Sequence, residues 1–408
     1  MNTIAADSQN LPVQTSPQFI QSIQAGLRYW LQKTETLGPE QVRWLDQRRK
    51  NLHQAVLFGL NQPATWKDTA RLLLQTFDFT EWRGYWMEWI PVFEQALAVA
   101  PQKETVIYGR LQNRLGQLYR LDNRLPEAEI QHKVALDLAQ RLANDELLVI
   151  TYSCLAEFYL SQKNVDQTKE YGQAALDLAQ TLPRLKRMEA FAHVSLGKIE
   201  EFIGNWPAAI RHYQQTSQIW RELDNHTYLA RTLTDLGIVY SRTNSFILAQ
   251  QAYEDAWGVL ELTNNDKDKV TVNLNLGTLF FRQEKWRDAE AVFLRVDPIV
   301  LREQNEFYLL ASYYNNLGNV YLKMQEWEKA SEHLIPAIEI FRETNNQLNL
   351  GNSLGTLATV YEQDGQQKKA VRFYEEAISL LQKFPESHWA QKLLGEFMPA
   401  YQRLQTKS

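Results

Sequence analysis

The side chains best suited to catalysis or metal binding in this chain are its seven histidines and its single cysteine, Cys154. The histidines are scattered, at positions 53, 132, 193, 212, 226, 333 and 388, without the close pairing of a metal site. One cysteine excludes an intramolecular disulfide and any cysteine-based metal cluster. The phosphate-binding loop GxxxxGK[ST], the dinucleotide fingerprint and the HExxH, GxSxG and protein-kinase motifs do not occur. We therefore predict no enzyme activity, no cofactor and no metal.

Asparagine amides offer a different chemistry. Asparagine is a poor helix former, because its amide competes for backbone hydrogen bonds. Asn275, Asn315, Asn316 and Asn319 nevertheless lie in segments that otherwise favour helix. An amide presents a donor and an acceptor together, which matches one peptide unit of an extended chain. The pattern favours peptide contact, and the alternative is that these amides face a wet groove or bond to the next helix.

A repeat positions these side chains. A Leu-Gly or Leu-Ala pair begins at residues 115, 155, 196, 236, 276, 317 and 357, so the step is 40 or 41 residues. An aromatic residue follows the small residue by three positions, except at Glu200, and mostly small residues follow by twelve and nineteen. Small residues let two helices approach closely, while leucine and the aromatic ring fill the space between them. Each repeat is thus predicted to be a helix pair, with His132 as an interior histidine of the first.

The repeats are expected to stack, because one helix pair cannot bury its own apolar face. Trp206, Trp286 and Trp327 take one common place between the two helices of their repeats. We interpret these tryptophans as packing beneath the turn and not as ligand-stacking residues.

These residues resemble the tetratricopeptide repeat, whose signature has Leu-Gly followed by Tyr and then by two spaced alanines. The match covers about residues 105 to 385. It departs from the commonest pattern of roughly 34 residues in its longer period, and it lacks the closing proline. Repeats of this length are similar to those of kinesin light chains and of bacterial Rap-type regulators. The resemblance implies an all-α, right-handed α-solenoid of seven helix pairs that binds a protein or peptide.

In that architecture the first helix of each pair lines a concave groove. The groove is then polar, with arginines at its amino end. The candidate peptide-binding residues are Arg110, Asn113, Arg114, Gln117, Arg231, Asn275, Asn315, Asn316, Asn319 and Asn352. The arginines could receive an acidic segment of a partner, and ion pairs within the solenoid are the alternative. The Asn-Leu-Gly-Asn run at 316 to 319 resembles the peptide-clamping positions of long-repeat relatives.

The ends of the chain differ from the repeats. Residues 1–17 are polar and are expected to be a disordered leader, and residues 386–408 to hold a capping helix. Residues 18–104 are expected to form an amino-terminal helical bundle or cap, and 105–385 the seven repeats. Within the bundle, helices are predicted over 19–34, 40–60, 65–77 and 81–100. Half of the twelve tryptophans fall in this segment and are expected to build its core.

Charge and hydropathy limit the classes of partner that the chain is expected to bind. The 43 basic and 48 acidic residues give a net charge of −5, which does not favour nucleic acid. Glu157, Glu201 and Glu362 on the groove wall also argue against RNA. No apolar run approaches the ~18 residues of a membrane span. We expect a non-enzymatic scaffold or adaptor in the cytoplasm that holds a peptide or an extended protein segment, with the oligomeric state left open. The alternative is a Rap-like, peptide-sensing regulator whose amino-terminal bundle acts on a signalling protein.

Overall fold

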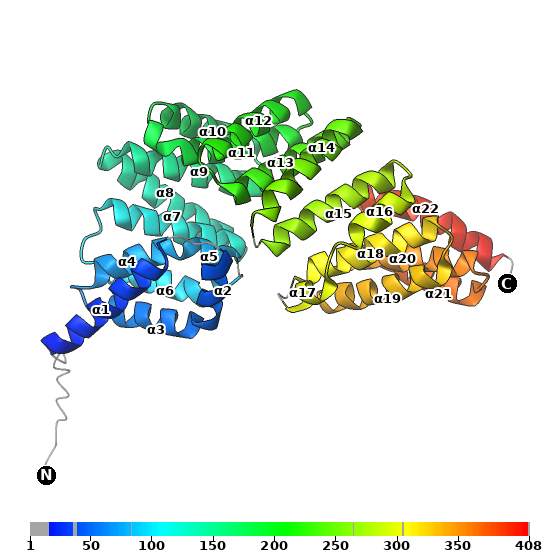
Figure 1. Cartoon of the computed structure of the whole chain (residues 1–408), viewed down its shortest axis with the longest axis horizontal. Helices are drawn as coiled ribbons and strands as arrows, with labels where there is room; N and C mark the ends of the chain where they lie inside the picture. Colours follow the sequence, from blue (N-terminus) through cyan, green and yellow to red (C-terminus); the bar gives the residue numbers. More distant parts are fainter. Residues whose placement is uncertain (1–15, 36–38, 83, 264, 304–305, 407–408) are drawn as a thin grey trace, which may run out of the picture. The chain divides into compact units, whose positions relative to one another are not determined.

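The computed structural model describes residues 16–35, 39–82, 84–263, 265–303 and 306–406. Within these ranges the chain is helical and contains no strand (Figure 1). It divides into two compact units, Met1–Ile219 and Trp220–Ser408, and each has its own hydrophobic core. Residues 1–15 of the expected leader lie outside the described residues.

Six helices precede the repeats. They are α1 (Pro17–Lys33), α2 (Pro39–Gln47), α3 (Arg49–Leu60), α4 (Trp66–Gln75), α5 (Phe77–Trp82) and α6 (Trp86–Ala98). Trp30, Trp66 and Trp89 are buried, at 7%, 5% and 0% exposure, as expected for core residues.

The prediction of unbroken helices over 40–60 and 81–100 was wrong, because each segment contains a break. The segment 40–60 breaks at Arg48, whose φ of −115° and ψ of 12° leave the helical region. The segment 81–100 is also interrupted, because a turn with Gly84 at a φ of 72° separates α5 from α6. Glycine adopts this left-handed conformation without the steric cost that a Cβ would bring.

Three helix pairs follow in the first unit. They are α7 (Val106–Leu121) with α8 (Leu125–Arg141), α9 (Asp145–Ser161) with α10 (Val165–Gln180), and α11 (Lys186–Phe202) with α12 (Trp206–Glu222). A short 3₁₀ turn, Pro183–Leu185, leads into α11.

The second unit continues the same pattern and ends in a single helix. Its pairs are α13 (His226–Arg242) with α14 (Phe246–Glu261), α15 (Asp266–Arg282) with α16 (Trp286–Phe293), α18 (Phe307–Lys323) with α19 (Trp327–Glu343), and α20 (Gln347–Gln363) with α21 (Gln367–Leu381). The last helix, α22 (His388–Gln405), packs on α21 through buried Leu393, Leu394 and Phe397. The predicted all-α fold of stacked helix pairs is confirmed, with seven pairs in the described part of the chain.

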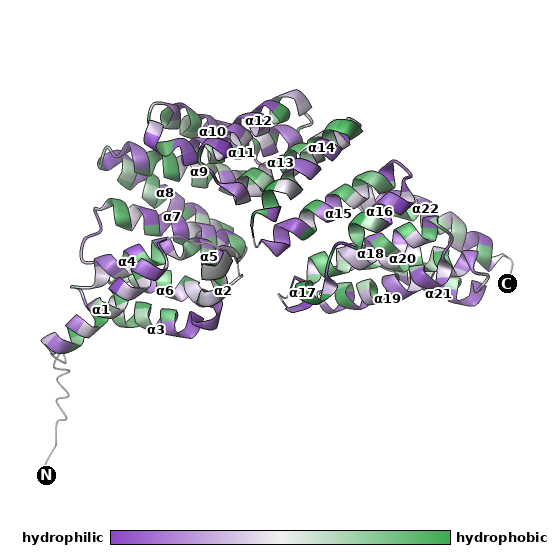
Figure 2. Ribbon diagram, in the orientation of Figure 1, coloured by the Kyte–Doolittle hydropathy of each residue, from purple (hydrophilic) through white to green (hydrophobic). Residues whose placement is uncertain are grey.

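The small residue of each Leu-Gly pair lies against the second helix of its own repeat. A Cβ placed on Gly237 would lie 2.4 Å from the Tyr253 ring, and one on Gly277 would lie 2.4 Å from the Phe293 ring. A distance this short requires the neighbour to move, so glycine is what allows the ring to lie on the helix backbone. The helices are amphipathic, because Figure 2 shows hydrophobic and hydrophilic residues on different faces of them.

Asparagines between the repeats begin the next helix. The side chains of Asn144, Asn225 and Asn346 accept hydrogen bonds from backbone N–H groups three residues later, at the starts of α9, α13 and α20. These N-caps satisfy donors that the helix itself leaves unpaired. The polar stretches expected at the turns therefore fix where the first helix of the next repeat starts.

The fifth repeat departs from the others in its second helix. Helix α16 ends at Phe293, and a separate helix α17 (Pro298–Glu303) follows. Pro298 has no backbone N–H to give, and it disfavours a helical conformation at Asp297 before it. The break leaves Leu294 and Ile299 exposed, at 54% and 66%.

Candidate peptide-binding surface

Five asparagines of the second unit lie on the first helices of three successive pairs. We call them the amide wall: Asn275 on α15, Asn315, Asn316 and Asn319 on α18, and Asn352 on α20. All five side chains are partly buried. Because α18 lies beside both α15 and α20, its three asparagines occupy the middle of the wall.

Asn315 is held by the neighbouring repeat. Its Oδ1 accepts a hydrogen bond of 2.8 Å from the Ser353 hydroxyl and a longer one of 3.4 Å from Asn352 Nδ2. Its own Nδ2 lies 3.5 Å from Asn316 Oδ1. For Asn315, the structure therefore shows the second possibility, in which the amide bonds to the next repeat and not to a peptide.

The other amides keep unused hydrogen-bonding capacity. Asn319 donates through Nδ2 to the Asn315 backbone carbonyl at 2.8 Å, which leaves its Oδ1 without a partner among the described residues. Asn316 has only the long 3.5 Å contact, and the Asn275 amide makes no hydrogen bond within the described ranges. Unused amide donors and acceptors therefore lie on a half-buried surface, where an extended backbone could pair with both kinds of group.

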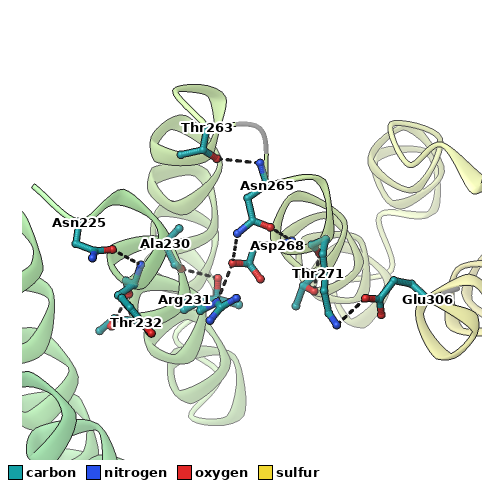
Figure 3. Close-up of polar contacts among 12 residues, drawn as sticks. Asn225, Ala230, Arg231, Thr232, Thr263, Asn265, Asp268, Thr271 and Glu306 are labelled. Atoms are coloured by element: carbon teal, nitrogen blue, oxygen red, sulfur yellow. Dashed lines mark hydrogen bonds and ion pairs between the residues drawn. The ribbon is translucent and has the colours of Figure 1, made fainter. Parts of the chain in front are cut away.

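Arg231 is engaged with the next repeat. Figure 3 shows its guanidinium beside Asp268, at an Nε–Oδ2 distance of 2.8 Å. Asn265 caps α15 and donates to the same carboxylate at 2.7 Å. One repeat further, Lys267 pairs with Glu306 at 2.7 Å. These contacts join the starts of successive first helices, so Arg231 serves an ion pair within the solenoid.

The first-unit candidates are also engaged. Arg110 pairs with Glu146 of the next repeat. Asn113 is only 1% exposed, and its Nδ2 donates to Thr151 Oγ1 at 2.8 Å. It accepts from the His132 ring at 3.1 Å, which assigns the proton to Nδ1 of that ring. Asn113 is therefore a core residue in this structure and offers nothing to a peptide.

Arg114 contacts α5, and Gln117 bonds to Arg114 and to the next repeat. The Arg114 guanidinium stacks on the Phe77 ring at 4.1 Å and lies 4.0 Å from Asp78, which also pairs with Arg187 at 3.3 Å. Gln117 is 8% exposed and donates to Glu157 at 3.4 Å. Helix α5 thus brings the chain's own carboxylate to Arg114, one of the arginines that were expected to receive a partner.

A buried acid lies in the same region. Burial, followed by the charge of Glu157, raises the pKa of the Glu81 carboxyl. Arg114 and Arg120 oppose this shift without cancelling it. Glu157 itself pairs with Arg120 at 2.6 Å, so the charged groups around Glu81 are engaged with one another.

Burial leaves His132 and Cys154 unsuited to catalysis. Burial lowers the pKa of His132 to about 3, so the ring is neutral and packs on Gly116 where other repeats carry an aromatic ring. This confirms the interior role predicted for His132. Burial raises the pKa of the Cys154 thiol to about 12, far from a reactive thiolate. No cluster of three or more His, Cys, Asp or Glu suited to a metal occurs in the described part of the chain.

Sequence reasoning missed several partners of the predicted residues. Ser353, Thr151 and Asp268 each stand 37 or 38 residues after the side chain that they contact, close to one repeat period. Reading the register one repeat ahead could have found them. The α5 carboxylate of Asp78 carries no such signal, because it lies outside the repeat.

Comparison with known proteins identifies the repeats. The tetratricopeptide repeat family model matches residues 188–261 and 309–383. A search of curated proteins found no match. No helix in the described ranges is both long and apolar enough to cross a membrane.

Solved structures show a similar fold at low sequence identity. The apo form of RapI is 16% identical, with 73% of this chain and 84% of that one covered at a TM-score of 0.58. The apo form of the quorum sensor NprR from B. thuringiensis is 15% identical, with 88% and 99% covered at 0.58. Aspartyl phosphate phosphatase F from Bacillus subtilis is 13% identical, with 90% and 95% covered at 0.55. The chain therefore contains tetratricopeptide repeats at 188–261 and 309–383, in a helical fold similar to those of the RapI and NprR structures.

Proposed function

We propose that the chain is a non-enzymatic scaffold or adaptor in the cytoplasm, and that its amide wall holds an extended segment of a partner protein or peptide. The observation that carries this proposal is the half-buried row of Asn275, Asn316, Asn319 and Asn352, whose amides retain unused donors and acceptors. An amide held half out of water favours a partner that can pair with both its donor and its acceptor.

The proposed surface is narrower than the one expected from sequence. Arg110, Arg114 and Arg231 are ion-paired within their own units, and Asn113 and Gln117 are buried. Binding there would have to break these contacts first. The amide wall needs no such exchange, so we place the segment on α15, α18 and α20.

The proposal is tested by retention of partners from the native cytoplasm on the immobilised chain, read by mass spectrometry. The variant Asn316→Ala/Asn319→Ala removes the two least-engaged amides of α18. The matched control, Gln250→Ala/Gln251→Ala, removes two amides from α14, where each bonds an acidic residue four positions later. We expect a partner that wild type and control keep and the asparagine variant loses. Equal retention by all three, with equal melting temperatures, would refute the amide wall.

A second candidate is a peptide-sensing regulator whose amino-terminal helices act on a signalling protein. The observation that favours it is the coverage of 88% and 90% of this chain by the NprR and phosphatase F likenesses, which must include part of the amino-terminal helices. Under this function, deleting α1 to α3 would abolish the output while the amide wall still bound its peptide. A scaffold would keep its partner after the same deletion.

A further inference from the structure

A groove lies between α1 and α3 in the first unit, away from the amide wall. Its volume is about 240 Å³, and it is lined by Phe19, Ser22, Ile23, Gly26, Ala55 and Phe58. The Phe19 and Phe58 rings meet edge to face at 6.3 Å, and they are 43% and 50% exposed. Two large aromatic side chains thus line a groove together with buried Ile23 and the small residues Ser22, Gly26 and Ala55.

Gly26 has no reason inside the chain to be glycine. In the middle of a helix, glycine costs roughly 1 kcal/mol relative to alanine. A Cβ placed on Gly26 would meet nothing within 4 Å, whereas one on Gly59 of α3 would lie 2.1 Å from the Thr69 hydroxyl. Internal packing therefore accounts for Gly59 and leaves Gly26 unexplained. Its missing side chain keeps the groove open to a group from outside.

The two helices carry positive charge and no acidic residue. Lys33 ends α1 and Lys50 is the second residue of α3; both are exposed, and no described residue lies within ion-pair distance of either. The Trp30 and Trp44 rings lie 5.3 Å apart, so the carboxyl-terminal end of α1 lies close to α2. The acidic side chains nearest in sequence are Asp46, which accepts from the Tyr85 hydroxyl, and exposed Glu35 after α1.

We propose that this groove docks an amphipathic α-helix of another protein. A bulky aliphatic side chain of that helix lies over Gly26 beside the Phe19–Phe58 ring pair, and its acidic side chains meet Lys33 and Lys50. Ser22 and Gly26 are four residues apart, which is the spacing that admits a ridge of a second helix. A second copy of this chain would bring like charges together, so charge complementarity favours a different, acidic partner. The inference does not depend on the amide wall.

The probe is a displayed library of helices with randomised surface residues, selected on the immobilised full-length chain and counter-selected on the bare support. We expect enrichment of Leu, Ile or Met at positions three or four residues apart, flanked by Asp and Glu. A selected helix should bind Gly26→Leu at least about tenfold more weakly, because the leucine fills the site of its apolar side chain. It should also bind Lys33→Glu/Lys50→Glu more weakly than wild type.

The same variants show whether a loss of binding comes from misfolding. Gly26→Leu replaces a helix-breaking residue in open space, so its melting temperature should equal or exceed that of wild type, and Ser22→Leu provides a second way to fill the groove. The proposal is overturned if the enriched helices are basic, or if both filling variants bind them as wild type does. It is also overturned if wild type forms a dimer that Gly26→Leu abolishes, or if phosphatidylserine vesicles bind wild type while no helix is enriched.

Discussion

The Nδ1 atoms of His193 and His212 lie 2.9 Å apart, across the interface between α11 and α12. Such a contact requires one ring to donate its proton and the other to accept with a lone pair, so at least one ring is neutral. The corresponding pair in the second repeat is Tyr152 and Tyr171, which pack ring against ring at 6.0 Å. The third repeat therefore has a hydrogen bond where the second has an aromatic contact.

This pair should make the chain sensitive to acid. Burial is the main cause that lowers the pKa of His193 to about 4, and it lowers the pKa of His212 as well. Lys186 and Arg211 reinforce these shifts, while Glu200, which is paired with Lys169, opposes the one on His212. Both folded pKa values lie below the unfolded value near 6.5, so the unfolded chain binds more protons. Stability is thus fully present above about pH 6.5 and is lost as pH falls towards about 4, by about 1–3 kcal/mol.

The measurement is the urea midpoint at pH 7 and at pH 4.5 for wild type and for His193→Leu/His212→Ala. That variant installs the residues that the fourth repeat has at these places, Leu233 and Ala252. His132 remains in both proteins, so the difference between them isolates the pair. Equal acid shifts of the two midpoints would show that the pair contributes no pH dependence.

Two glycines in neighbouring helices should respond to alanine in opposite directions. Gly237→Ala would place its Cβ 2.4 Å from the Tyr253 ring, and overpacking of this kind costs about 1–3 kcal/mol. Gly258→Ala on α14 meets nothing within 4 Å, and the gain in helix propensity should stabilise the chain by up to about 1 kcal/mol. Thermal unfolding of both variants tests the predicted helix contact. A melting temperature for Gly237→Ala at or above that of wild type would contradict it.

The repeat register predicted more of the fold than of the candidate site. The spacing of Leu236-Gly237 predicted a close helix pair because a small residue has few other uses at a fixed period. The break after Phe293 was missed, although Asp297-Pro298 signals it, because the period alone implied a full second helix. Site residues were harder to predict, because a polar side chain on the predicted groove wall can face solvent, the next repeat or the core. Asn113 proved to be buried because Thr151 and His132 both reach its amide.

The Arg231 and Asp268 pair should contribute modestly to stability. Its Nε–Oδ2 distance is 2.8 Å, but the side chains are 39% and 13% exposed, so water and salt screen the attraction. A double-mutant cycle with Arg231→Gln and Asp268→Asn should give a coupling free energy of about 0.5–1 kcal/mol that falls as salt is added. A coupling above about 3 kcal/mol, insensitive to salt, would instead place the pair in a desolvated setting.

Binding at the amide wall should depend little on salt. The five asparagines are uncharged, and their hydrogen bonds to a peptide backbone involve no counterion release. We expect the Kd of a partner segment to change less than about threefold between 0.05 and 0.5 M NaCl, where the Debye length falls severalfold.

Lys323 provides the control, because it is an exposed charge one turn after Asn319 and could make binding depend on salt. Lys323→Gln should therefore leave the Kd nearly unchanged at both salt concentrations, while Asn316→Ala/Asn319→Ala weakens it about tenfold or more, as expected when hydrogen-bond partners are removed. Affinity that falls steeply with salt and is lost in Lys323→Gln would mean that the segment is recognised by its charge and not by its main chain.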